Sequence, residues 1–245
     1  MEESRKTLAI VLNRQDYREY DSLVSFYTSE FGKITLLARG TKRLKSKLAG
    51  HLEPMNLIDL MIIPGKGRDY AAGAINQEVF FSVKEDLNKL YYAGLGLRWF
   101  RNLTPENEQD KPLFFLLLEY LKTLNNIKQE LIREDGELLF SFFAFKFLTE
   151  MGYKPELEHC LNCHKKICPG KNYFNLHSGG LMCESCFAAE KNREIREILT
   201  ISDNCVKILR FMLENSLGLS LKIKIDKKLV KELATLTKGF LNFRN

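Results

Sequence analysis

The stretch Cys160-Leu-Asn-Cys163-His-Lys-Lys-Ile-Cys-Pro-Gly-Lys-Asn-Tyr-Phe-Asn-Leu-His-Ser-Gly-Gly-Leu-Met-Cys183-Glu-Ser-Cys186 contains two Cys-x-x-Cys pairs separated by 19 residues. Each pair can bend into a knuckle that points both sulfurs at one ion, and this spacing is typical of a zinc site with four thiolate ligands. The sequence therefore predicts one Zn2+ per chain held by Cys160, Cys163, Cys183 and Cys186.

The residues between the two pairs predict how the chain folds back on itself. Pro169-Gly170 and Ser178-Gly179-Gly180 are turn signals, and residues 173–176 between them are expected to form a short strand. This order resembles a zinc ribbon or knuckle. Because four protein ligands leave no position for water, we expect a structural ion rather than a catalytic one.

Other interpretations of the cysteines stay open. The pairs are alternatively two disulfides, or a coincidence of spacing, although nothing marks the chain as secreted. Cys205 lies in an apolar helical pattern, which favours a buried, unreactive thiol. Four further side chains are either replacement ligands or surface residues of a short loop: His159, His164, Cys168 and His177.

The composition is that of a globular protein. The chain has 245 residues, of which 45% are hydrophobic and 11% aromatic, enough for one large domain or two to three small ones. The N-terminus has no signal-peptide pattern, and no apolar run approaches the roughly 20 residues that span a bilayer. We therefore expect a cytoplasmic protein without membrane contact, in a reducing setting that suits thiolate ligands.

Residues 1–81 alternate short apolar runs with turn signals, which is typical of β-strands. Residues 40–52 contain the only helix formers of this region and predict a short helix after the third strand. Five strands with such a helix are the pattern of an OB-type barrel, so we assign 1–81 to an OB-fold nucleic-acid-binding domain. The expected strands lie near residues 7–12, 22–28, 33–38, 56–63 and 69–81.

From Ser82 the apolar period becomes helical. Ser82-Val-Lys-Glu85 has the form of a capping box and opens a helix that reaches Trp99-Phe100. These helices form a domain at 82–245, interrupted by the zinc-binding insertion at about 156–187, so the predicted fold class is multi-domain α+β. Further helices are expected at 112–124, 138–151 (the most buried), 187–199, 202–216 and 226–243, with Ser202 and Asp226 as N-caps.

The densest charge signal lies in the barrel region. Six cations occur between Phe31 and Leu52 without a single acidic residue, and in an OB fold this segment lies beside the face that commonly holds single strands. The alternative is a solvated, lysine-rich loop. The predicted DNA-binding residues are Lys33, Arg39, Lys42, Arg43, Lys45 and Lys47.

Two weaker sets accompany this cluster. Aromatic side chains of the same sheet are either base-stacking residues or barrel core: Tyr17, Tyr20, Phe26 and Tyr27. A second basic set either extends the binding surface or forms the solvated face of the last helix: Lys222, Lys224, Lys227, Lys228 and Lys231.

The motifs of common enzymes are missing, including the nucleotide-binding P-loop, the Gly-x-Ser-x-Gly elbow and His-Glu-x-x-His. We therefore expect a protein without catalytic residues. One enzymatic alternative is a nuclease-like metal site formed by Asp16, Glu19 and Asp21. The simpler interpretation is that these acidic residues form local charge pairs with Arg14 and Arg18.

The order of these parts resembles the bacterial RecO family of recombination mediators. The resemblance rests on residues 9–24, on Phe31 to Arg43 with its Ala-Arg-Gly-x-x-Arg stretch, on Lys45-Ser-Lys and Leu52-Glu-Pro54, and on the late Cys-x-x-Cys pairs. It covers essentially the whole chain. Family members bind single- and double-stranded DNA, anneal complementary strands without ATP and help to load the recombinase RecA.

The resemblance implies roles and partners beyond those that the residues themselves predict. It places DNA contacts on the cations at 39–47 and zinc on the four paired cysteines. It implies two protein partners, RecR and the acidic C-terminal tail of single-stranded DNA-binding protein, the latter in the helical domain near Arg98 or Arg101. It also implies association with the nucleoid. The competing interpretation is a zinc-ribbon docking scaffold without DNA activity.

Overall fold

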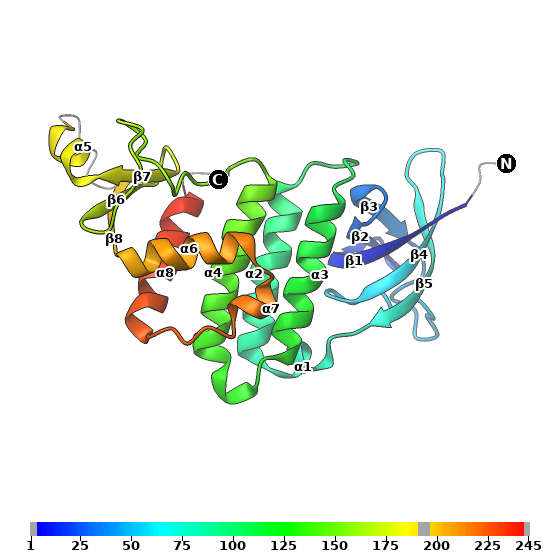
Figure 1. The fold of residues 1–245 in the computed structure, drawn as a ribbon. Coiled ribbons are helices and arrows are strands. Elements are labelled where there is room, and N and C mark those ends of the chain that lie inside the picture. The colour runs from blue at the N-terminus through cyan, green and yellow to red at the C-terminus, as the bar shows by residue number, and fades with distance from the viewer. Residues whose placement is uncertain (1–3, 191–196, 243–245) are drawn as a thin grey trace. The chain divides into compact units, whose positions relative to one another are not determined.

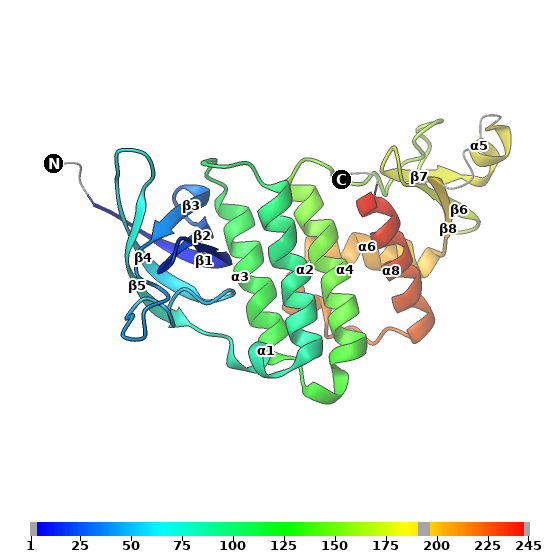
Figure 2. The ribbon, with the colours of Figure 1, turned by 180° about the vertical axis from the view of Figure 1, so that it is seen from behind.

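The structure is a computed structural model that describes residues 4–190 and 197–242. It divides into two compact units, Met1–Asn126 and Ile127–Asn245. Figure 1 and Figure 2 show the chain from opposite sides.

The first unit begins with a closed five-stranded barrel of order β1-β2-β3-β5-β4, as predicted (Figure 1). Alternate side chains of its strands point inward, and they form one apolar core around Val24, Phe26, Ile58 and Leu60. A single pair, Leu37 with Tyr70, joins β3 to β5 in parallel. The strands are β1 (Arg5–Tyr17), β2 (Asp21–Thr28), β3 (Gly32–Ala38), β4 (Leu57–Ile63) and β5 (Tyr70–Glu78).

The predicted helix at 40–52 is wrong, because this segment forms a series of turns. The Arg14 guanidinium donates hydrogen bonds to the carbonyls of Thr41 and Ala49, both at 3.1 Å. Because these two carbonyls accept hydrogen bonds from a side chain of β1 and not from helical N–H groups, tertiary hydrogen bonds override the local helix propensity. The fifth strand is also shorter than expected, since Phe81 already begins a helix.

Three helices complete the first unit: α1 (Phe81–Glu85), α2 (Leu87–Leu103) and α3 (Lys111–Asn126). The predicted capping box at Ser82 is wrong. Ser82 lies inside α1, and its hydroxyl accepts a hydrogen bond from the buried Lys89 ammonium (2.7 Å). The N-cap is instead Asp86, which starts α2 and accepts from the backbone N–H groups of Asn88 and Lys89.

The second unit is built around α4 (Ile132–Glu150), which the one-turn helix η1 (Gln129–Leu131) precedes. Most of α4 is buried, as expected for a helix that is apolar on nearly all sides, and it contacts each described helix that follows residue 201. Ser202 caps α6 as predicted, because its hydroxyl accepts from the Cys205 N–H (3.2 Å). The later helices are α6 (Asp203–Glu214), α7 (Leu217–Ser220) and α8 (Lys227–Asn242).

We call residues 156–201 the cysteine element; its described part contains a three-stranded sheet of order β7-β6-β8 and the short helix α5. The expected strand at 173–176 corresponds to β6. The predicted helix at 187–199 is wrong at its end, because Ile198 and Leu199 pair with β6 as part of β8; residues 191–196 of that prediction lie outside the described residues. The elements are β6 (Asn172–Asn175), β7 (Gly180–Cys183), α5 (Glu184–Ala189) and β8 (Ile198–Ile201).

Among the helices that the structure describes, none has both the length and the apolar character needed to cross a bilayer.

One glycine of the barrel is required by its surroundings. Gly32 adopts φ +64°, and a Cβ at this position would lie 1.7 Å from the carbonyl oxygen of Glu108. We expect Gly32→Ala to lower the free energy of unfolding by at least about 2 kcal/mol, because both the backbone conformation and the clash must be relieved. Urea denaturation measures the change. Gly50→Ala is the matched control, since no heavy atom lies within 4 Å of its Cβ position; equal midpoints for the two variants would contradict the prediction.

Candidate functional site

Arginines and tyrosines pair repeatedly on the outside of the barrel. The Arg39 guanidinium lies 4.3 Å from the ring centre of Tyr70 and donates a hydrogen bond to its hydroxyl (2.7 Å). Arg43 lies 5.3 Å from the ring of Tyr20. Tyr17 has two such neighbours, Arg18 at 5.3 Å and Arg68 at 5.9 Å. Each pair has cation–π geometry, which holds a guanidinium beside an aromatic ring.

Hydrogen bonds bring these residues together from separate parts of the chain. The Gly40 N–H donates to the Asp21 carboxylate (2.8 Å), and the Lys42 N–H donates to the Tyr20 carbonyl (3.0 Å). The Lys42 ammonium donates to the Arg18 carbonyl (2.9 Å). The loop after β3 is thereby bound to the β1–β2 turn, and its cations lie beside the tyrosines.

We call this region the arginine–tyrosine surface. It consists of Tyr17, Arg18, Tyr20, Arg39, Lys42, Arg43, Lys45, Lys47, Arg68 and Tyr70.

Of the six predicted DNA-binding cations, Arg39, Lys42 and Arg43 are joined to this surface by the contacts above. Lys45 and Lys47 are exposed in the same loop after β3. Lys33 is separate from them. Its side chain is 10% exposed, its ammonium donates to the Arg101 carbonyl (2.8 Å), and Glu106 lies 3.8 Å away. Lys33 therefore links the barrel to the end of α2, and we leave it out of the surface.

The predicted aromatics divide between core and surface. Phe26 and Tyr27 are 0% and 1% exposed, so the core interpretation holds for both; burial raises the pKa of Tyr27. Tyr20 is 45% exposed and Tyr17 is half-buried. Tyr70, Arg68 and Arg18 are further residues of this surface that were not among the binding residues predicted from the sequence. The signal for the first two was the Arg68-Asp-Tyr70 segment directly after a glycine-rich turn.

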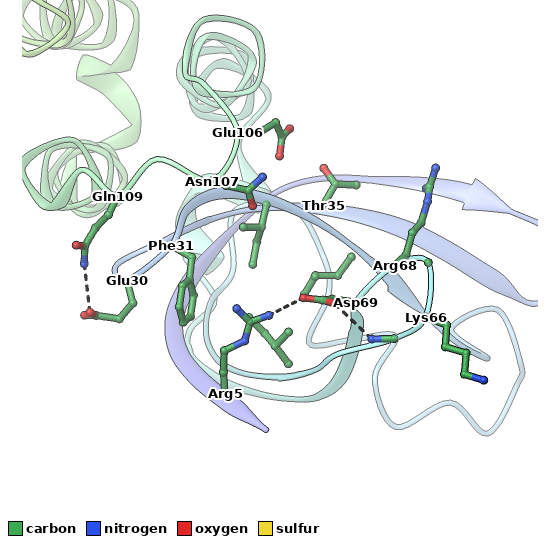
Figure 3. A pocket seen from close by; sticks show the side chains of 15 residues that line it. Arg5, Glu30, Phe31, Thr35, Lys66, Arg68, Asp69, Glu106, Asn107 and Gln109 are labelled. Carbon is green, nitrogen blue, oxygen red and sulfur yellow. Dashed lines mark hydrogen bonds and ion pairs between the residues drawn. The ribbon is translucent and has the colours of Figure 1, made fainter. Parts of the chain in front are cut away.

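A pocket of about 670 Å3 lies next to the arginine–tyrosine surface and shares Arg68 with it (Figure 3). Arg5 and Asp69 form an ion pair at 2.5 Å within it, and the Arg5 guanidinium lies 5.1 Å from the ring centre of Phe31. Figure 3 shows the side chains of Arg68 and Lys66 pointing away from this ion pair. The Arg68 guanidinium lies 5.9 Å from the ring centre of Tyr17 and so belongs to the arginine–tyrosine surface as well as to the pocket wall.

The acidic residues of the β1–β2 turn do not form a metal site. Asp16 is paired with the Lys42 ammonium (3.4 Å), and Asp21 accepts from Gly40. Within residues 4–190 and 197–242, the only group of metal-ligating side chains close enough to share one ion is formed by cysteines. The nuclease-like alternative therefore has no geometric support.

That group consists of Cys160, Cys163, Cys183 and Cys186, whose ligand atoms all lie within 4.8 Å of one another. The structure thus confirms that the two Cys-x-x-Cys pairs meet. The sulfurs of Cys163 and Cys183 are 3.9 Å apart, and the Cys183 N–H donates to the Cys160 sulfur (3.5 Å). All six cysteines of the chain are free thiols, so the disulfide interpretation is wrong.

The protonation chemistry of the four cysteines fits a metal site. The Ser185 hydroxyl and the Cys186 N–H lower the pKa of Cys183 to about 6. Its neighbour Cys183 raises the pKa of Cys186 to about 12. Four thiolates this close repel one another, so they need a bound cation to be deprotonated together. The four cysteines can therefore hold one metal ion, with the convergent sulfurs that such an ion requires.

The other candidate ligands lie outside this group. Cys168 is exposed, and its sulfur lies 3.7 Å from the Lys166 carbonyl. His159 is 3.8 Å from Glu156, with which it can form an ion pair when protonated. Cys205 is fully buried, and burial raises its pKa, so the thiol is held in its unreactive form.

The C-terminal lysines lie on the second unit. Lys222 and Lys224 are exposed in the turn before α8, while Lys228 and Lys231 are exposed on α8 itself. Lys227 forms an ion pair with Glu134 in the first turn of α4 (2.6 Å). One of these lysines thus has a structural partner, and the others stay candidates for binding.

Comparison with known proteins covers nearly the whole chain. Residues 1–75 match the family described as "Recombination protein O N terminal", and residues 84–244 match "Recombination protein O C terminal". A relative from Dehalococcoides mccartyi strain CBDB1, named "DNA repair protein RecO", is 32% identical over 97% of this chain and 89% of its own length. A relative of the same name from Alkaliphilus metalliredigens is 28% identical over 96% of this chain and 92% of its own length. Another from Bacillus pumilus is 29% identical over 84% of this chain and 75% of its own length.

Proposed function

Because this chain belongs to the RecO family of DNA repair and recombination proteins, we propose that it binds single- and double-stranded DNA and anneals complementary strands without ATP. The observation that carries the proposal is the arginine–tyrosine surface. Its cations come from the β1–β2 turn, the loop after β3 and the β4–β5 turn, which in OB folds border the nucleic-acid face.

The chemistry of the surface suits a single strand. Exposed lysines and arginines neutralise phosphates, and aromatic rings stack on bases at roughly 1–3 kcal/mol per base. Three tyrosines already hold guanidinium groups beside their rings, so a strand that follows the cations meets aromatic faces along the same path. Neither phosphate contact nor base stacking depends on the DNA sequence, which fits a repair protein that must act on any broken DNA.

Annealing follows from electrostatics. Two complementary strands repel each other through their phosphates, and a protein that neutralises both lowers this barrier and raises their local concentration. Base pairing then supplies the specificity. If all seven cations of the surface contact phosphates, the salt slope on single strands is at most about 5, from roughly 0.7 per phosphate contact.

We further propose that the four cysteines hold zinc, because soft thiolates in a tetrahedral set favour this ion. Bound zinc would cross-link the two knuckles and contribute folding energy. With four protein ligands it would have no open position for substrate. No other described group resembles a catalytic constellation, so we propose a mediator without enzymatic activity.

The proposed partners are RecR and the acidic tail of single-stranded DNA-binding protein, and the proposed outcome is loading of RecA in the cytoplasm. Support for the tail comes from α2. Leu87 and Tyr91 are 83% and 62% exposed there, and the exposed Arg98 falls on the same helical face by its spacing. An apolar stripe with one cation suits a peptide that ends in an aromatic residue and a carboxylate.

The same stripe is the observation that favours the second candidate, a docking scaffold without DNA activity. Exposed aliphatic and aromatic side chains in one patch mark protein-binding surfaces. A scaffold keeps its partner binding when the arginine–tyrosine surface is altered, whereas a DNA mediator loses activity.

The deciding experiment is annealing of two labelled complementary oligonucleotides, measured without ATP over a salt series. We expect pairing to be at least 10-fold faster than without protein at low salt, and this gain to disappear as salt rises, because phosphate contacts are screened. No acceleration at low salt would contradict the mediator and favour the scaffold.

A further inference from the structure

The sheet of the cysteine element has two edge strands, β7 and β8, and their outward backbone groups differ in hydrogen bonding. At β7 the edge is covered. The Leu181 N–H donates to the Glu156 carbonyl and the Leu161 N–H donates to the Leu181 carbonyl, both at 2.9 Å. Residues before the first cysteine pair and within it thus occupy the hydrogen-bonding positions of this edge.

At β8 no described segment covers the edge. The Leu176 N–H donates to the Glu197 carbonyl (2.7 Å), and hydrogen-bonded pairs alternate along an antiparallel ladder. Leu199 and Ile201 therefore bond to β6, while the N–H and C=O groups of Ile198 and Thr200 point away from it. Throughout the described residues, no hydrogen bond is formed by these outward backbone groups.

A groove of about 230 Å3 runs between this edge and α8. Leu199, Ile201 and Leu236 form its apolar part, and Lys231 and Thr235 line its α8 side. Glu232 is the one carboxylate among the described residues that line the groove. Ser202 donates to both of its oxygens, from the N–H (2.6 Å) and from the hydroxyl (2.8 Å). Both oxygens of the Glu232 carboxylate thus already accept hydrogen bonds within the chain.

The charge beside the groove is positive. Lys231 is exposed, and Lys228 lies one turn earlier on α8, so the two cations are neighbours on the helix surface. Among the described residues neither has an ion-pair partner, in contrast to Lys227 with Glu134. An occupant of the groove therefore meets two uncompensated ammonium groups.

We propose that the β8 edge binds an extended, acidic segment of a partner protein by strand addition. The segment pairs with Ile198 and Thr200 through its backbone, and places carboxylates near Lys231 and Lys228. Main-chain hydrogen bonds supply affinity in such complexes and alternate side chains supply specificity. The proposal does not depend on DNA binding, because the groove lies wholly on residues 199–236 of the second unit.

The test uses the full-length, metal-loaded protein and a fluorescent peptide of alternating valine and aspartate, eight residues long, measured by anisotropy. Thr200→Pro removes the outward N–H of the β8 edge, where proline is tolerated, and Thr200→Ala keeps it. We expect the proline variant to bind at least 10-fold more weakly and the alanine variant to bind like wild type. Lys231→Glu is expected to weaken binding at least 5-fold without touching the strand.

Further probes separate this mode from others. A peptide with N-methylated backbone amides is expected not to bind, and a lysine-valine peptide is expected to bind poorly. Equal peptide binding by the Thr200→Pro and Thr200→Ala variants would overturn the proposal. A dimer of the wild-type chain that the Thr200→Pro substitution converts to monomer would also overturn it, because the edge would then bind a second copy of this chain. If the proline variant does not fold, the outcome with Lys231→Glu decides: unchanged affinity overturns strand addition beside Lys231.

Discussion

Cys160→Ala is expected to abolish metal binding and to unfold the cysteine element. Cys160 is 1% exposed, and its sulfur accepts from the Cys183 N–H, so the substitution removes both a ligand and an internal contact. Structural zinc contributes about 10–16 kcal/mol of apparent binding energy in zinc-finger peptides. An element of two knuckles and four-residue strands has no large core to compensate for this loss.

Metal analysis and limited proteolysis measure the effect. We expect one zinc per wild-type chain, well under one per Cys160→Ala chain, and new cleavage between residues 156 and 201 in the variant. Chelation of the wild type is expected to reproduce the cleavage. The barrel belongs to the other compact unit, so annealing is expected to persist.

Cys168→Ala provides the matched control, because this exposed cysteine lies outside the four-cysteine group. Its zinc content and cleavage pattern are expected to equal those of wild type. A wild-type protein that is free of metal and resists protease equally well would show that the thiols support the fold without an ion.

The convergence of the four cysteines was predictable from the sequence because the information is local. Each Cys-x-x-Cys pair fixes two sulfurs within four residues, and turn residues between the pairs fix the reversal. The barrel was predictable for a similar reason, since its strands show short apolar runs between glycine-containing turns. In both cases the local pattern and the final fold agree.

The wrong predictions share a different cause, which is competition from contacts distant in sequence. Residues 40–52 have helix formers, but Arg14 binds two of their carbonyls from β1. Ser82 has the spacing of an N-cap, but Asp86 takes that role and the Ser82 hydroxyl serves Lys89. Propensity is a weak prior where a buried polar group requires a partner.

The tyrosines of the candidate site show the same limit. Tyr70 follows a turn and is separated from Arg39 by 31 residues, so only the parallel pairing of β3 with β5 brings them together. A period-two pattern shows which side chains alternate along one strand. It does not show which strands become neighbours in a closed barrel.

The double reversal Lys42→Glu, Arg43→Glu is expected to lower affinity for a single strand about 100-fold at low salt and to remove most of the annealing. Two phosphate contacts are lost, which lowers the salt slope by roughly 1.4. Two carboxylates are added beside the remaining cations of the surface, and Lys42 no longer balances Asp16. Binding and annealing measured over a salt series give both quantities.

Two matched variants identify the cause of such a loss. Lys128→Glu, Lys154→Glu changes the net charge by the same amount on exposed residues of the second unit that lie outside both basic sets, so an equal loss there would mean that overall charge, rather than the arginine–tyrosine surface, drives binding. Tyr20→Leu keeps every cation and removes one ring. We expect it to weaken binding roughly 5- to 100-fold with an unchanged salt slope, since stacking releases no counterions. We expect the affinity to fall in both the Lys42→Glu, Arg43→Glu variant and the Tyr20→Leu variant, and the salt slope to fall only in the first. That result would assign phosphate contact to the two cations and base stacking to Tyr20, on one surface.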